Sequence, residues 1–171
     1  EEIKEFMKQL FPDIKNEEIG NVDSSLREYM WEHMASTLLG TNENQTFNIY
    51  NGSGANGKSK LVELLGVVLG EYKGTVPISL ITQKRSNIGG TSSEIYNLIG
   101  TRYAVMQEPT KNDRINEGIM KELTGGDPIQ CRALFKDSVT FIPQFKLAVC
   151  TNNMLDVASN DDGTWRRLRK V

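Results

Sequence analysis

The stretch Gly52-Ser53-Gly54-Ala55-Asn56-Gly57-Lys58-Ser59 decides the fold, because it matches the pattern G-x-x-x-x-G-K-S. An apolar segment with strand character, Thr46–Tyr50, precedes it, and a helical pattern, Lys58–Leu69, follows it. A strand, a glycine-rich turn and a helix in this order bind phosphate, since backbone N–H groups turn inward and the helix N-terminus adds a positive dipole end. The alternative interpretation is a glycine-rich turn without a ligand.

Lys58 and Ser59 have the most specific expected roles in this loop. The Lys58 ammonium should reach the β- and γ-phosphates of a nucleotide, and the Ser59 hydroxyl should bind Mg²⁺. The whole stretch from Gly52 to Ser59 is therefore the predicted nucleotide-binding loop. A nucleoside triphosphate and Mg²⁺ are the expected ligands.

Strand patterns and helical patterns alternate along the rest of the chain. Buried strands are predicted at Arg102–Met106 and Phe145–Thr151, with a short strand near Thr75–Ile78. Helices are predicted at Ser92–Ile99 and Ile115–Leu123. This alternation predicts an α/β fold with a central, mostly parallel sheet that is flanked by helices on both faces.

A small helical segment is predicted before this sheet. Residues Ile3–Phe11 form a short helical pattern that ends at Pro12, and a second helix extends to Gly40. The second helix follows Ser25-Leu26-Arg27-Glu28, which has the spacing of a capping box. His33 lies in this helix, and we expect a structural role for it.

The composition fits one globular domain and excludes several classes of protein. Of 171 residues, 38% are hydrophobic and 25% charged, so a disordered chain is excluded. Two cysteines and one histidine are too few for a His/Cys zinc site or Cys-His catalysis. Apolar runs such as Phe145–Cys150 are far shorter than the roughly 20 residues of a membrane span. The net charge of −2 leaves DNA contacts to a local basic patch or to several assembled copies.

The ends and the cysteines of the chain give weaker expectations. The acidic start, Glu1–Glu5, has no Met and resembles neither a signal peptide nor a transit peptide, so we expect an excised fragment. Cys131 and Cys150 provide no disulfide framework, which favours a reducing, intracellular setting.

Polar residues that follow two of the predicted strands are candidates for catalysis. Glu108 lies at the strand ends, where open α/β sheets bind ligands, and is the best candidate to activate water and to hold Mg²⁺ through its shell. Asn152 could contact the γ-phosphate or the water, although the pattern does not separate it from Asn153. The alternative interpretations are a solvated acid and a turn-forming Asn-Asn pair.

Two basic segments complete the candidate set. Arg166 or Arg167 could stabilise transition-state charge at a γ-phosphate, often that of a neighbouring subunit, or both could belong to a surface basic cluster. A hairpin is predicted from Ile129–Ala133 and Ser138–Ile142, with Phe135 and Lys136 at its tip. These two side chains could contact a base and a phosphate backbone, or could be merely solvated.

Together these segments resemble the superfamily 3 helicase domain of the AAA+ class. The closest likeness is to the primase-helicases of poxviruses and other large nucleocytoplasmic DNA viruses, with related phage and plasmid primases. The resemblance extends from about Ser36 to Val171 and is carried, in order, by Gly52–Ser59, Tyr103–Pro109, Asn116–Arg132, Pro143–Asn152 and Asp161–Leu168. These match the family's motifs A, B, B′ and C and its arginine finger. The run Lys121-Glu122-Leu123-Thr124-Gly125-Gly126-Asp127 is especially specific.

The resemblance implies a P-loop NTPase of the AAA+ type that acts as a hexameric, ATP- and Mg²⁺-dependent DNA helicase. In such rings single-stranded DNA occupies a central channel, and a primase domain often lies on the same polypeptide. The implied setting is viral or mobile-element DNA replication in the host cytoplasm or nucleus. The implied catalytic residues are Lys58, Glu108, Asn152 and an arginine finger. In the family an aliphatic residue follows the finger, so Arg167, which precedes Leu168, is the first choice and Arg166 the second. Lys136 and Phe135 would contact DNA.

The sequence departs from the family in one acid, and two other functions stay open. Gln107 precedes Glu108 where many members carry two acids, so Glu108 is the one acid available to Mg²⁺, and Ser59 and waters could suffice to hold the ion. We expect a helical segment over 1–40 and an ATPase domain over 41–171 that ends before the family's last strand. The alternative functions are another P-loop NTPase, such as a kinase or a DNA-packaging ATPase, and a non-hydrolysing oligomerisation or DNA-binding module.

Overall fold

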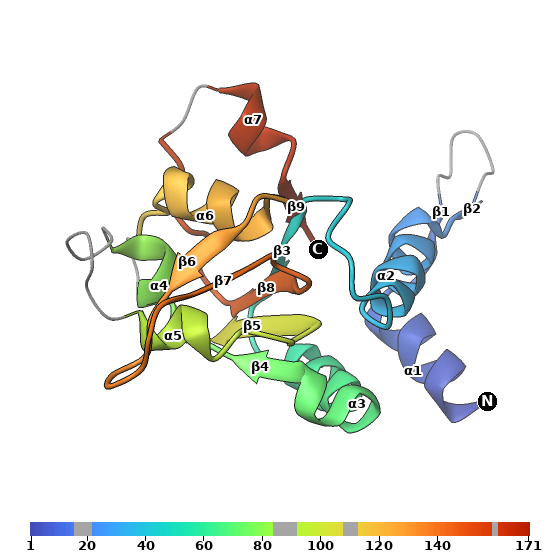
Figure 1. Ribbon diagram of the computed structural model, residues 1–171. Helices are drawn as coiled ribbons and strands as arrows, with labels where there is room; N and C mark the ends of the chain where they lie inside the picture. Colours follow the sequence, from blue (N-terminus) through green and yellow to red (C-terminus); the bar gives the residue numbers. More distant parts are fainter. Residues whose placement is uncertain (16–21, 84–91, 108–112, 159–160) are drawn as a thin grey trace.

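A five-stranded parallel sheet lies at the centre of the computed structural model, which describes residues 1–15, 22–83, 92–107, 113–158 and 161–171 (Figure 1). The strand order is β4-β5-β8-β3-β9. In chain order these strands are β3 (Phe47–Asn51), β4 (Lys73–Thr75), β5 (Tyr103–Gln107), β8 (Lys146–Thr151) and β9 (Leu168–Lys170). Because all five strands run the same way, they end at one edge of the sheet, where such folds bind ligands.

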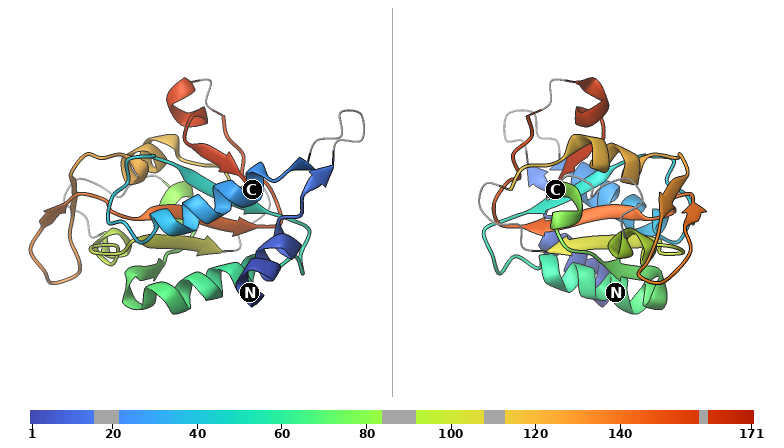
Figure 2. Two further views of the ribbon diagram at one scale, coloured as in Figure 1. Left: turned by 90° about the vertical axis from the view of Figure 1, so that its right-hand side faces the viewer. Right: turned by 60° about the vertical axis from the view of Figure 1, so that its left-hand side comes forward.

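Helices cover both faces of this sheet, as Figure 2 shows. One face packs against α1 (Glu2–Leu10), α2 (Ser25–Ser36) and α3 (Lys58–Leu69), and the other against α4 (Ser79–Thr82), α5 (Ser93–Tyr96) and α6 (Glu117–Thr124). Successive residues of β8 serve the two faces: Leu147 belongs to the core under α4, α5 and α6, and Ala148 belongs to the core under α3. Burial on both faces is why this strand is a continuous apolar run.

The remaining elements are short. They are the antiparallel pair β1 (Ile14–Lys15) and β2 (Val22–Asp23), the 3-10 turn η1 (Gly70–Tyr72), the antiparallel hairpin β6 (Ile129–Cys131) and β7 (Val139–Phe141), and α7 (Asp162–Trp165). The loop between β6 and β7 extends away from the sheet (Figure 1). No described helix has the length and apolar character to cross a membrane.

Most predicted elements are confirmed within one or two residues, and the helix Lys58–Leu69 is confirmed at both ends. The α/β fold with a parallel central sheet and the hairpin is likewise as predicted. The short strand predicted at Thr75–Ile78 lies two residues earlier, at Lys73–Thr75. Pro77 has no N–H for a sheet ladder, so the strand cannot continue through it.

The predicted capping box at Ser25 is wrong. Ser25 lies in the first turn of α2, and Ser24 occupies the N-cap position without a side-chain hydrogen bond to the backbone of the helix. The Ser24 hydroxyl donates to the Glu28 carboxylate at 2.6 Å, and the Asp23 carboxylate accepts from the Ser25 N–H at 2.8 Å. The helix therefore begins one residue earlier than the capping-box pattern indicates.

The residues after the two arginines form a strand that the sequence analysis did not predict. Asp161 starts the helix α7 by accepting from the Thr164 N–H at 3.0 Å. The following residues form β9, which pairs in parallel with β3 from Leu168 opposite Phe47. The sheet therefore has an edge strand directly after the two arginines.

His33 is a buried structural residue, as we expected from its place in a helix. Its Nε2 lies 2.9 Å from the Tyr50 hydroxyl, and its Nδ1 lies 3.4 Å from Nδ2 of Asn48. Burial, together with repulsion from the Lys146 ammonium, lowers the pKa of His33 to about 4. The imidazole is therefore neutral in the folded protein at neutral pH.

We expect acid to destabilise the fold through His33. The unfolded chain binds a proton near the ordinary pKa of 6.5 and the folded chain only near 4, so the free energy of unfolding falls as pH drops through this window. Between pH 7 and pH 5 the loss should be about 2 kcal/mol. Urea unfolding at both pH values measures it. The His33→Gln variant should lack most of this loss, and an equal loss in both proteins would assign it to other groups.

Candidate active site

The glycine-rich loop connects β3 to α3 at the edge where the strands end. Gly57 has a φ of +83° and caps α3, and a Cβ there would lie 2.8 Å from Cδ1 of Leu10. A Cβ at Gly52 would lie 1.7 Å from Nδ2 of Asn56. The positive φ at Gly57 therefore favours glycine, and at Gly52 any other residue would require the Asn56 side chain to move.

Lys58, the first residue of α3, connects the loop to the end of β8 through its ammonium group. Its Nζ donates to the Gly52 carbonyl at 2.9 Å, to Oδ1 of Asn56 at 2.8 Å and to Oδ1 of Asn152 at 3.1 Å. A hollow of about 490 Å³, lined by Gly54–Lys60 and Asn152, opens beside it. Small-molecule sites have volumes in this range. All three acceptors are neutral. An anionic phosphate is a stronger acceptor for the Lys58 ammonium, so a phosphate in the hollow could replace them.

Asn152 and Asn153, which the sequence does not separate, have different contacts in the structure. The Asn152 side chain lines the hollow and accepts from Lys58. Asn153 contributes backbone groups to a turn: its N–H donates to the Thr151 hydroxyl at 3.0 Å, and its carbonyl accepts from that hydroxyl. The structure therefore brings Asn152 together with the loop, as the sequence predicts.

The two residues predicted to bind Mg²⁺ are only partly described. Ser59 is exposed and lines the hollow. Glu108 lies outside the described residues, so its predicted role stays a prediction. In the described ranges there is no group of three or more His, Cys, Asp and Glu side chains that could hold a metal ion. Ser59 is thus the described residue that could contribute to such a site.

Arg166 and Arg167 lie where the strands of the sheet begin, whereas the loop lies where the strands end. Leu168 pairs with Phe47, the first residue of β3, and the loop follows Asn51, the last. At about 3.3 Å per residue, these two ends of β3 are roughly 13 Å apart. The structure therefore does not bring either arginine to the loop of its own chain.

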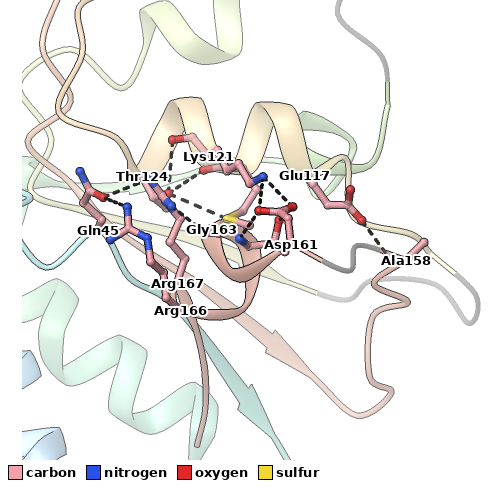
Figure 3. Close-up of polar contacts among 11 residues, drawn as sticks. Gln45, Glu117, Lys121, Thr124, Ala158, Asp161, Gly163, Arg166 and Arg167 are labelled. Carbon is pink, nitrogen blue, oxygen red and sulfur yellow. Dashed lines mark hydrogen bonds and ion pairs between the residues drawn. The ribbon is translucent and has the colours of Figure 1, made fainter.

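The two arginines belong to a polar cluster around α7 (Figure 3). Nη2 of Arg166 and Nη2 of Arg167 donate to Oε1 of Gln45, at 2.8 and 3.0 Å, and Nη1 of Arg167 donates to the Gly163 carbonyl at 2.6 Å. Arg166 is exposed and Arg167 half-buried. Burial and the neighbouring Arg166 lower the pKa of Arg167, while the Asp161 carboxylate raises it.

A salt bridge holds the start of α7 in this cluster. Lys121 of α6 donates to both carboxylate oxygens of Asp161 at 2.8 Å. The same carboxylate accepts from the Thr164 N–H and hydroxyl, at 3.0 and 2.9 Å. Lys121 thus ties α6 to the turn that carries the arginines. The sequence indicated it only as part of the specific run 121–127.

The tip of the β6–β7 hairpin is strongly exposed. Phe135 is 97% exposed and has a φ of +59°. The Lys136 ammonium lies 4.9 Å from the centre of the Tyr96 ring, a cation–π contact with α5. Both predicted DNA-binding residues are therefore accessible at the projecting tip.

In the polar cluster around α7, Gln45 is the residue that sequence reasoning missed. It belongs to none of the motifs, and it contacts the arginines only because β9 pairs beside β3. Its positive φ of +51° is likewise invisible in the sequence. The strand pairing was the only signal that could have identified it.

The fold and the loop define the class of protein. A parallel sheet with helices on both faces, and a G-x-x-x-x-G-K-S loop between β3 and α3, make the chain an α/β protein of the P-loop NTPase type. The sequence profile of the protein family DUF5906, described as a family of unknown function, matches residues 50–167. The chain therefore belongs to this family.

Similar curated proteins are viral. Over 149 residues the chain is 45% identical to L207/L206 of Acanthamoeba polyphaga mimivirus, which carries a provisional helicase name; the match covers 87% of this chain and 16% of that protein. Over 122 residues it is 30% identical to C962R of African swine fever virus, which carries a provisional primase name; the match covers 71% of this chain and 13% of that protein. The chain thus spans only a small part of these relatives.

A solved structure has the same fold. The apo C-terminal region of NrS-1 superimposes with a TM-score of 0.72 at 14% identity, covering 99% of this chain and 37% of that one. At this identity the likeness shows the fold alone. Together with the viral helicase and primase relatives, it confirms the resemblance to viral superfamily 3 primase-helicases.

Proposed function

We propose that the chain is the motor of a viral primase-helicase, which hydrolyses ATP between the subunits of a hexameric ring and moves along DNA. The observation that carries this proposal is the contact of Lys58 Nζ with Asn152 Oδ1 at 3.1 Å. It joins the loop after β3 to the end of β8 around one hollow. The helicase and primase names of the relatives support the role on DNA.

The residues around the hollow would divide the work of hydrolysis. Lys58 would exchange its neutral acceptors for the β- and γ-phosphates, which are stronger acceptors. Ser59 would help to hold Mg²⁺, which neutralises phosphate charge when it is bound. Asn152, released by Lys58, would orient the γ-phosphate or the attacking water. Glu108 would activate that water, and an arginine of the neighbouring subunit would stabilise the charge that develops.

The tip of the β6–β7 hairpin would bind the DNA strand. Phe135 offers an exposed ring on which a base can stack, and Lys136 offers a cation for the backbone. One tip alone binds weakly, but several tips that face one channel add their contacts. This addition would allow a chain with a net charge of −2 to hold a single strand.

ATP turnover should depend on Asn152 and not on Asn153. Replacing Asn152 with alanine should lower kcat by about a hundredfold, the usual cost of one lost transition-state contact. The Asn153→Ala variant is the matched control, because its turn contacts come from backbone groups and should survive. DNA-stimulated phosphate release by the intact protein measures both. Equal rates for wild type and Asn152→Ala would contradict the assigned role, and no turnover in any variant would favour a non-hydrolysing module.

A further inference from the structure

Gln45 joins two cations through one neutral acceptor. Its Oε1 accepts from Arg166 at 2.8 Å and from Arg167 at 3.0 Å (Figure 3). Within the described part of the chain, neither guanidinium forms an ion pair. The nearby carboxylate of Asp161 is instead bound to Lys121 at 2.8 Å. The structure thus holds two adjacent guanidinium groups on one neutral acceptor, while the nearby Asp161 carboxylate, which raises the pKa of Arg167, is paired with Lys121.

The backbone at Gln45 has an unfavourable conformation. Its φ of +51° lies in the left-handed region, which side chains other than glycine and asparagine seldom adopt. The Gln45 N–H donates to the Asn42 carbonyl at 3.1 Å, which closes a turn directly before β3. Because β3 pairs with β9, this turn brings the amide to the arginines at the start of β9. Such strain is typical of functional sites.

A neutral acceptor and a carboxylate affect the charge of a guanidinium differently. An amide oxygen fixes the direction of a guanidinium but leaves its charge uncompensated, whereas a carboxylate binds more strongly and neutralises it. The Arg167 side chain fits this picture: its Nε is buried without a hydrogen-bond partner among the described residues. Burial and Arg166 together lower the pKa of Arg167 more than the Asp161 carboxylate raises it, so the charge of this cation is only partly compensated.

We propose that Gln45 is a positioning residue that aims Arg166 and Arg167 and keeps their charge available for an anionic phosphate of a nucleotide bound to a second copy of the chain. The inference rests on the proposed function, since it requires the arginines to act on a neighbour's ATP. It adds a residue outside the motifs to that site.

The Gln45→Glu variant of the intact protein tests this proposal. The new carboxylate should pair with both arginines, so kcat for ATP should fall at least about tenfold while the Kd of a fluorescent ATP analogue stays within about twofold. The melting temperature should rise by about 2–4 °C, because the cluster gains charge-assisted hydrogen bonds. A merely structural role would lower stability and activity together. An unchanged kcat or a lower melting temperature would overturn the proposal.

Two further variants separate the side chain from the turn. Gln45→Gly relieves the positive φ but removes the acceptor, so kcat should fall without loss of stability; wild-type kcat would assign Gln45 to the turn alone and overturn the proposal. Asn44→Asp adds a charge at an exposed neighbouring position and should change neither quantity. Wild-type turnover that depends on the arginines but not on Gln45 overturns this inference alone. A wild type without turnover overturns the proposed function as well.

Discussion

Replacing Lys58 with alanine should lower ATP turnover by about a thousandfold, the upper range for loss of one donor at a developing charge. The Lys58 ammonium donates to acceptors on both sides of the hollow, the loop and Asn152, so it lies where the phosphates would bind. Without it, affinity for ATP and kcat should both fall. Steady-state phosphate release with DNA present, together with binding of a fluorescent ATP analogue, measures the two effects separately.

Lys60 provides the matched control for this experiment. It also lines the hollow and lies on α3 two residues away, but its ammonium pairs with Glu63 at 2.7 Å, and both side chains are exposed. An exposed pair of this kind contributes little to stability. The Lys60→Ala variant should therefore keep turnover within about twofold of wild type. An equal loss in both variants would mean that general positive charge, and not the position of Lys58, supports turnover.

The part of the fold that the sequence predicts is the part whose side chains are buried in a regular pattern. β8 is predictable because Leu147, Ala148 and Val149 are fully buried on its two faces. Lys146 in the same strand is an exception: it is 3% exposed, and its ammonium donates to the Thr41 carbonyl. β9 was missed because its residues, Leu168-Arg169-Lys170, include a single apolar side chain, and pairing with β3 alone makes them a strand.

The candidate site divides in the same way. The loop with Lys58 and Ser59 is predictable because eight consecutive residues carry its chemistry. Asn152 became separable from Asn153 only through the turn that Thr151 makes. The contact between Gln45 and Arg166 joins residues 121 positions apart, so no local pattern contains it. Long-range contacts of this kind depend on which strands become neighbours, and the order of strands in a sheet is not written in any single segment.

Arg167 should be essential for turnover, but only in the subunit next to the one that holds ATP. Removing an arginine that stabilises a transferring phosphate costs about a thousandfold or more in kcat. Arg167 lies at the end of the sheet opposite the loop of its own chain, so under the proposed function the loss should arise at an interface between subunits. Arg167→Ala should therefore abolish turnover without weakening ATP binding, which phosphate release and analogue binding measure. Arg166→Ala tests the second choice, and the larger loss identifies the finger.

Mixing inactive subunits tests whether the site is shared. In a ring of Lys58→Ala and Arg167→Ala subunits, about a quarter of the interfaces should join an intact loop to an intact arginine, because each interface is heterologous. Turnover should therefore reappear on mixing two preparations that are each inactive. A P-loop kinase that completes its site within one chain would stay inactive. No recovery, with mixed rings demonstrated by mass, would contradict a site that is shared between subunits and would mean that Arg167 supports turnover within its own chain, for example through its contacts with Gly163 and Gln45.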